Sequence, residues 1–196
     1  MQLSVAQWFW GLAACTLLTA CSSEDKPGRC ESTVTNQLQD PEFESLTRGR
    51  RERLWSVSEH AAGRSFSYAL EDGVLTITKT GTEPWGIVSQ GIRNPELGGR
   101  GIAYRAEIRL DMQAPVPAHG FKQGGGLTLQ ARANGRVVGT STLDHEPHMG
   151  KSDWVPVSVA MQLPPGVNYV QAGILHQANG TLQVRNPTLV FTDCGD

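Results

Sequence analysis

The sequence predicts an all-β protein, an antiparallel β-sandwich preceded by a segment that is cleaved off. Three observations lead to this fold class. The 196 residues include 22 glycines and 11 prolines, which are spread between short apolar runs and indicate many turns. Several runs alternate apolar and polar residues with a period of two, as half-buried strands do. Dipeptides that favour hairpin turns separate three pairs of runs.

Each alternating run places its apolar side chains on one face and its polar side chains on the other. The apolar members of four runs are Leu75 and Ile77; Ile102, Tyr104, Ala106, Ile108 and Leu110; Leu127, Leu129 and Ala131; and Val155, Val157, Val159 and Met161. Such segments bury one side and leave the other in water, as the strands of antiparallel sheets do. No stretch predicts a long amphipathic helix, an internal repeat or a second domain.

Asn-Gly and Asp-Gly dipeptides mark the turns between neighbouring runs. They occur at residues 72–73, 134–135 and 179–180. Both central residues of the tightest hairpin turn need a positive φ, which Asn, Asp and Gly tolerate best. We therefore expect three hairpins, of which the last joins residues 170–176 to residues 181–184.

The N-terminal residues predict an export signal. Residues 1–20 contain no Asp, Glu, Lys or Arg, and residues 5–20 are almost wholly apolar. This run is short for a membrane span and is followed at once by polar residues, which is typical of a signal peptide. Its end, Leu-Thr-Ala-Cys at residues 18–21, resembles the lipobox of bacterial lipoproteins. The resemblance implies cleavage before Cys21 and acylation of Cys21. A serine directly after the lipidated cysteine, as at Ser22, resembles the pattern of lipoproteins that reach the outer membrane of Gram-negative bacteria.

These boundaries predict a signal peptide at residues 1–20, a tether at residues 21–29 and a sandwich domain at residues 30–196. Cleavage and acylation leave Cys30 and Cys194 as the remaining thiols. Two thiols exported to an oxidising compartment tend to form a disulfide. That bridge requires the two ends of the domain to be neighbours, because the Cα atoms of a disulfide lie within about 7 Å. Two free thiols are the alternative.

Several short motifs follow one another in a recognisable order. They are Asn36, Phe43-Glu44, Leu54-Trp55, residues 72–77, residues 85–90, residues 101–104, Trp154, residues 163–167, Asn186 and residues 189–191. This order resembles the galactose-binding-like jelly rolls, particularly the carbohydrate-binding modules that accompany cellulases and xylanases. The resemblance covers about residues 36–193 and implies a jelly-roll sandwich that binds a ligand without transforming it.

The same family often carries a structural calcium near the two chain ends. The resemblance implies Glu44 and Asp193 as its ligands, since a hard cation is bound by carboxylate and carbonyl oxygens. A disulfide between the chain ends is the alternative way to hold them together. No other cofactor is expected.

Sugar recognition needs a flat aromatic surface and planar polar groups on one exposed face. The aromatic candidate is Trp85, in the loop before a predicted strand. The polar candidates are Gln90, Arg105, Gln130, Arg132 and His176. We interpret Trp55, Tyr104 and Trp154 as packing residues. A structural or solvated role is the alternative for every candidate.

The sequence favours a protein that binds rather than an enzyme. It contains no Gly-x-Ser-x-Gly, His-Glu-x-x-His or P-loop motif. A formal net charge of -2 provides no overall attraction for nucleic acid. We therefore predict a non-catalytic lipoprotein of the cell envelope, anchored by lipid, that binds a glycan or cell-wall polymer. A structural or assembly lipoprotein that docks onto another envelope protein is the alternative, and a periplasmic hydrolase ranks last.

Overall fold

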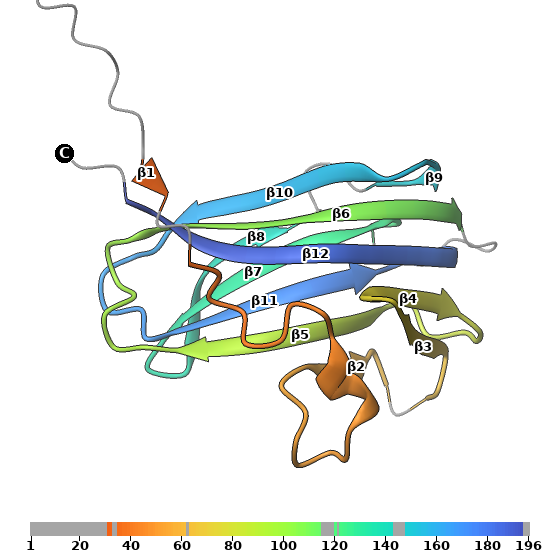
Figure 1. The fold of residues 1–196 in the computed structure, drawn as a ribbon, viewed down its shortest axis with the longest axis horizontal. Coiled ribbons are helices and arrows are strands. Elements are labelled where there is room, and N and C mark those ends of the chain that lie inside the picture. Colours follow the sequence, from red (N-terminus) through yellow and green to blue (C-terminus); the bar gives the residue numbers. More distant parts are fainter. Residues whose placement is uncertain are drawn as a thin grey trace, which may run out of the picture.

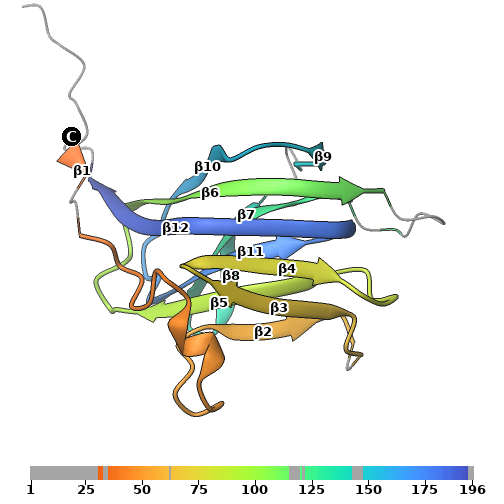
Figure 2. The same cartoon turned by 45° about the vertical axis from the view of Figure 1, so that its right-hand side comes forward.

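The protein is a sandwich of two antiparallel β-sheets. The computed structural model describes residues 31–32, 35–61, 63–114, 120, 122–142 and 148–193. In this part of the chain the only helix is η1 (Glu44–Thr47), one turn of 3-10 helix. All strand pairs are antiparallel, and the two sheets lie one over the other (Figures 1 and 2). The fold class predicted from the alternating runs is confirmed.

The larger sheet has seven strands. Its order is β10 (Val155–Gln162), β6 (Gly101–Gln113), β12 (Asn179–Asp193), β4 (Val74–Lys79) and β3 (Phe66–Glu71), with β1 (Glu31–Ser32) paired to β12 and β9 (Gly150–Lys151) paired to β6. The smaller sheet has the order β2 (Ser56–Glu59), β5 (Gly86–Arg93), β11 (Tyr169–His176), β7 (Gly125–Ala133) and β8 (Arg136–Thr142). β11 therefore lies at the centre of the five-stranded sheet.

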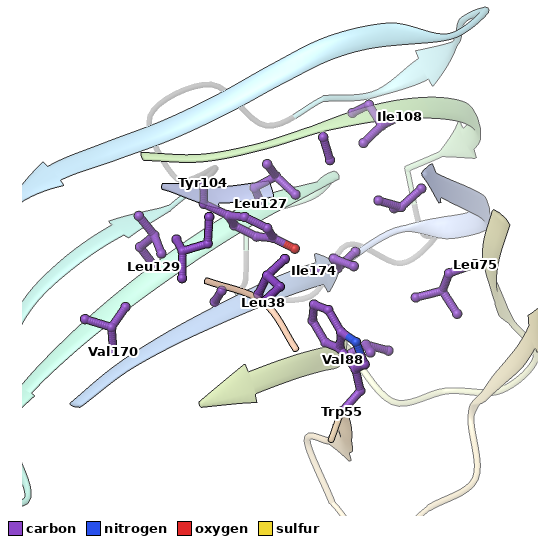
Figure 3. Close-up of a cluster of buried hydrophobic side chains, with 14 of the residues drawn as sticks. Leu38, Trp55, Leu75, Val88, Tyr104, Ile108, Leu127, Leu129, Val170 and Ile174 are labelled. Carbon is purple, nitrogen blue, oxygen red and sulfur yellow. The ribbon is translucent and has the colours of Figure 1, made fainter. Parts of the chain in front are cut away.

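The inward faces of the two sheets form one hydrophobic core (Figure 3). Alternation along the strands is the cause, because every second side chain of a strand points to the same face. Tyr104 and Trp55 are fully buried in this core, as their interpretation as packing residues requires. The indole nitrogen of Trp55 donates a hydrogen bond of 2.7 Å to the carbonyl of Asp40. This bond satisfies the polar atom that burial would otherwise leave unpaired.

Two of the three predicted hairpins are present, and the third prediction is wrong. β3 and β4 join through Asp72 and Gly73, at φ 48° and 73°, and β7 and β8 join through Asn134 and Gly135, at φ 50° and 77°. The dipeptide at residues 179–180 instead begins β12, which lies in the other sheet from β11 and pairs with β6. A dipeptide signal reports the local turn, whereas the sheet that the next strand joins depends on distant partners.

The two ends of the described domain lie side by side. β1 pairs with the end of β12, with Glu31 opposite Asp193 and Ser32 opposite Thr192 (Figure 1). Residues 1–30 and 194–196 lie outside the described residues, so the signal peptide, the lipid anchor and the disulfide stay predictions. Within the described residues, no helix has the length and apolar character needed to cross a membrane.

We predict that Cys30 and Cys194 form a disulfide, since each directly adjoins a member of the Glu31–Asp193 strand pair. Alkylation of the exported protein under denaturing conditions, followed by mass spectrometry, should modify neither thiol until a reductant is added. Closing so long a loop stabilises the folded state by about 5 kcal/mol in the chain-entropy model, so Cys194→Ser should lower the free energy of unfolding by up to that amount. Alkylation of both thiols without reductant would contradict the prediction.

Candidate functional site

The structure distributes the sequence-predicted ligand residues over several places. Gln130 and Arg132 point outward from β7, because their neighbours Leu129 and Ala131 are buried in the core. Arg105 is exposed on β6, which belongs to the other sheet. The two sheets face each other across the core, so these three side chains do not share one surface.

Trp85 lies away from both groups, directly before β5. Its ring meets the imidazole of His60 edge-on, with centroids 5.9 Å apart, and its backbone carbonyl accepts a hydrogen bond of 3.1 Å from the amide of His60. The carboxylate of Glu83 contacts the same imidazole at 3.3 Å. Trp85 is half-buried in this cluster between β2 and β5.

Gln90 and His176 face the interior, so the expectation that they face solvent is wrong. Gln90 is 3% exposed, and its side-chain oxygen accepts a hydrogen bond of 2.8 Å from the amide of Gln39. His176 is fully buried and packs against the ring of Phe66. Neither side chain can meet a ligand on the surface of this structure.

The environment of His176 favours the neutral imidazole. Burial lowers the pKa of His176 to about 4, aided by the positive charge of Lys79 and opposed by a hydrogen bond to the carbonyl of Gly180. Nε2 lies 3.1 Å from that carbonyl, and the amide of Ala178 donates to Nδ1 at 3.4 Å. A neutral ring with its proton on Nε2 satisfies both contacts. His176 is therefore a structural residue that tolerates burial only without charge.

The outer face of the five-stranded sheet brings together an aromatic ring and two guanidinium groups. Tyr169 begins β11 and lies opposite Arg93 of β5 on one side and Arg132 of β7 on the other. The guanidinium carbon of Arg93 lies 4.9 Å from the centroid of the tyrosine ring, and that of Arg132 lies 5.8 Å from it. We call these three residues the Arg–Tyr–Arg row.

A glycine gives the ring of Tyr169 its position. A Cβ atom added at Gly91 would lie 2.7 Å from Cε2 and Cζ of Tyr169 and would also meet its hydroxyl oxygen. The ring therefore lies across the backbone of Gly91, in the space that any other side chain would occupy. A tyrosine in this position is an aromatic surface close to the sheet, with a polar hydroxyl at one end.

Polar side chains continue this face next to the Arg–Tyr–Arg row. Gln171, two residues along β11 from Tyr169, lies opposite Gln130 and Gly91. Its amide nitrogen donates to the hydroxyl of Ser89 at 2.8 Å, which lies 3.1 Å from the hydroxyl of Ser56. Ser89 is itself buried, so the groups of this face that can bind the hydroxyls of a ligand are the half-buried amides of Gln130 and Gln171.

The side-chain oxygen of Gln130 holds the guanidinium of Arg132. It accepts hydrogen bonds of 2.9 Å from Nε and 2.6 Å from Nη2. Arginine has five N–H donors, so this contact leaves others to point at a ligand. A guanidinium stays protonated in proteins and cannot act as a general acid or base at neutral pH. The chemistry of this face is therefore recognition.

The outer face of the seven-stranded sheet is already engaged with itself. Trp154 is half-buried beneath Arg109 and Arg185, whose guanidinium carbons lie 5.0 and 4.2 Å from its ring centroids. Nε of Arg185 donates to the carboxylate of Glu107 at 2.9 Å, and Asn186 donates to the same oxygen at 2.8 Å. These two hydrogen bonds lower the pKa of Glu107. One of the two arginines that pack on the indole, Arg185, is itself held by the carboxylate of Glu107.

The calcium site expected at Glu44 and Asp193 stays a prediction, because the side chain of Asp193 lies outside the described part of the structure. The carboxylate of Glu44 lies 3.5 Å from the guanidinium of Arg48. The backbone amides of Glu44 and Ser45 donate hydrogen bonds of 3.0 and 2.7 Å to the carboxylate of Asp40. Both views place η1 well away from the end of β12 (Figures 1 and 2). Among the described residues, no three His, Cys, Asp or Glu side chains are grouped so that they could hold a metal ion.

Tyr169 and Arg93 are the residues of this face that the sequence analysis did not single out. Tyr169 follows a Pro-Pro-Gly turn, and Arg93 ends a strand beyond Gln90, so neither stands out locally. Their neighbourhood is created by strand pairs that join segments about 40 to 80 positions apart in the chain. The period-two alternation of β5 could have identified Arg93 as an outward residue, because it assigns Gly91 and Arg93 to one face of the strand and Val88 and Gln90 to the other.

Comparison with known proteins defines the fold but not a family. No protein-family model and no curated protein matches the chain. The enzymatically active domain of tailspike protein 4 from bacteriophage CBA120 is similar, with a TM-score of 0.55, 11% identity, 79% of this chain and 21% of that one covered. This chain thus spans about a fifth of the tailspike chain.

Two further structures match most of their own length. The Stig cyclase Fisc from Fischerella sp. TAU has a TM-score of 0.50 and 10% identity, with 82% of this chain and 98% of that chain covered. The CBM22-1 xylan-binding domain of Paenibacillus barcinonensis Xyn10C has a TM-score of 0.47 and 12% identity, with 73% and 88% covered. At these identities the likeness to the tailspike domain and to the cyclase shows the fold alone, a two-sheet antiparallel β-sandwich.

Burial of His176 makes the stability of the fold depend on pH. The folded state holds its pKa near 4, below the ordinary value of 6.5, so the unfolded chain takes up the proton first as the pH falls. The stabilisation is complete above about pH 6.5 and is lost toward pH 4, which amounts to about 3 kcal/mol. Chemical denaturation at several pH values should show this slope, and His176→Gln should remove it. An identical slope in the variant would contradict the assignment.

Proposed function

We propose that this protein is a non-catalytic, lipid-anchored module of the bacterial cell envelope that binds a glycan on the outer face of its five-stranded sheet. The observation that carries the proposal is the ring of Tyr169, which lies on Gly91 between two arginines and next to the amides of Gln130 and Gln171. Sugars present C–H groups on their ring faces and hydroxyls at their edges. An aromatic ring beside planar polar groups complements both.

The location in the envelope rests on the sequence. The apolar segment before Cys21 and the lipobox-like residues 18–21 support export, cleavage and acylation, with the outer membrane of a Gram-negative bacterium as the destination. A binding face held at a membrane by lipid can retain a polymer of the cell wall or surface without any further partner.

Removal of the aromatic surface should weaken glycan binding. The full chain, purified in detergent, is applied to a glycan array and to peptidoglycan sacculi. Tyr169→Ala should weaken binding at least about tenfold, because a buried aromatic contact accounts for much of the affinity of such a site. Gly91→Val should act in the same direction, because the added side chain occupies the position of the ring.

Arg105→Ala, on the opposite sheet, is the matched control and should leave binding unchanged. Loss of binding in Arg105→Ala with full binding in Tyr169→Ala would place the ligand on the other face. If no carbohydrate binds the wild-type chain, the glycan proposal is wrong.

One observation favours docking onto an envelope protein as a second candidate function. β8 is the outer strand of the five-stranded sheet, and its neighbouring residues Val137 and Val138 are 49% and 44% exposed. An outer strand with apolar side chains can add to the sheet of another protein. In this case Val138→Asp would abolish co-purification with a specific envelope protein from detergent-solubilised membranes, whereas Tyr169→Ala would not.

A further inference from the structure

We infer that the glycan bound on the five-stranded sheet is acidic, with carboxylate groups on its sugar rings, as in a polymer of uronic acids. The inference rests on the proposed glycan-binding function and specifies the chemistry of its ligand. It follows from the charges of the Arg–Tyr–Arg row and of the residues beside it.

The row places two positive charges on either side of one ring. Arg93 and Arg132 lie opposite Tyr169 on its two neighbouring strands. Their backbones are therefore separated by two inter-strand spacings, or about 10 Å. Both guanidinium groups turn toward the ring between them, as the distances of 4.9 and 5.8 Å show. An anionic group next to Tyr169 would lie within reach of both.

Among the described residues, no carboxylate is paired with either arginine. The neighbours of the row on the same face are uncharged: they include the amides Gln130 and Gln171, Val137 opposite Arg132, and, two residues further along, Ser89 and Thr128. Within the described part of the chain, neither Arg93 nor Arg132 forms an ion pair, and the hydrogen bonds of Arg132 go to the uncharged Gln130.

The opposite face shows the other arrangement of the same residue type. Arg185 pairs with Glu107 at 2.9 Å, Lys151 lies 3.7 Å from Asp111, and Arg109 donates to Gln183 at 2.7 Å. On that face carboxylates pair with two of the cations, Arg185 and Lys151, whereas neither arginine beside Tyr169 has a carboxylate partner among the described residues.

A neutral sugar would cover these arginines and remove water from them without offering a counter-charge. Covering an unpaired charge is costly, so such a ligand binds weakly. A carboxylate on the sugar accepts hydrogen bonds from a guanidinium in two-pronged geometry, which is among the strongest polar contacts in proteins. The ring of Tyr169 and the amides of Gln130 and Gln171 then contact the remaining sugar surface. An acidic polysaccharide satisfies the whole face.

Binding to three polymers distinguishes the effect of the ligand's charge from the effect of its sugar rings. The full chain in detergent is titrated with polygalacturonate, with the same polymer after complete methyl esterification, and with neutral β-1,4-galactan. We expect polygalacturonate to bind at least about tenfold more tightly than its ester, since charged hydrogen bonds are lost on esterification. Arg93→Gln and Arg132→Gln should each reduce this preference several-fold, and Arg64→Gln, an exposed arginine in the loop before β3, should leave it unchanged.

The possible failures are distinguishable. Equal binding of the acid, its ester and the galactan, all lost in Tyr169→Ala, would overturn the acidic ligand and leave the glycan-binding function standing. Binding of none of the three polymers, together with a glycan array without signal, would overturn both. Double-stranded DNA of matched charge that binds as tightly as polygalacturonate would reveal attraction to any polyanion and would also overturn the inference. Circular dichroism of each variant excludes loss of the fold as the cause.

Discussion

The candidate site depends on the register of β11 with its two neighbours. A strand presents every second residue to the same face, so a slip by one residue would send Tyr169 and Gln171 into the core and bring apolar residues to the surface. Burial of the intervening residues fixes the register: Val170, Ala172 and Ile174 are fully buried. The core energetics of the inner face thus determine which side chains meet on the outer face, although the two sets do not touch.

His176 ends the same strand, and the register of β11 also determines its position. It occupies an inward position and is tolerated because its two hydrogen bonds suit the neutral ring. The strand that organises the candidate site therefore ends in a group that resists protonation. Acid would weaken the pairing at the centre of the five-stranded sheet, from the inside of the sandwich, without any change in the exposed residues themselves.

The fold was predictable from local patterns, and the site was predictable only in part. Alternation identified β6, β7 and β10, and two turn dipeptides identified real hairpins, because these features depend on residues close in the chain. The same alternation, applied strictly, places Gln90 with Val88 and His176 with Ile174 inside the sandwich; the error lay in judging these two side chains by their polarity alone. Gln130 and Arg132 were found because polar residues alternate with buried ones along β7. Tyr169 joins them only through pairing across β11, which no local pattern in one sequence contains.

The pairing of β1 with the end of β12 has a consequence for how the protein would stand on a membrane. With Cys21 as the proposed anchor, ten residues separate the lipid from Glu31, a reach of no more than about 35 Å. β5 ends and β11 begins at the same end of the sandwich as β1 (Figure 1), so the Arg–Tyr–Arg row lies toward the tethered end. A polymer bound there would run close above the lipid headgroups, and the far hairpins would point away from the bilayer. The protein would then act as a clamp that holds a glycan chain near the membrane surface.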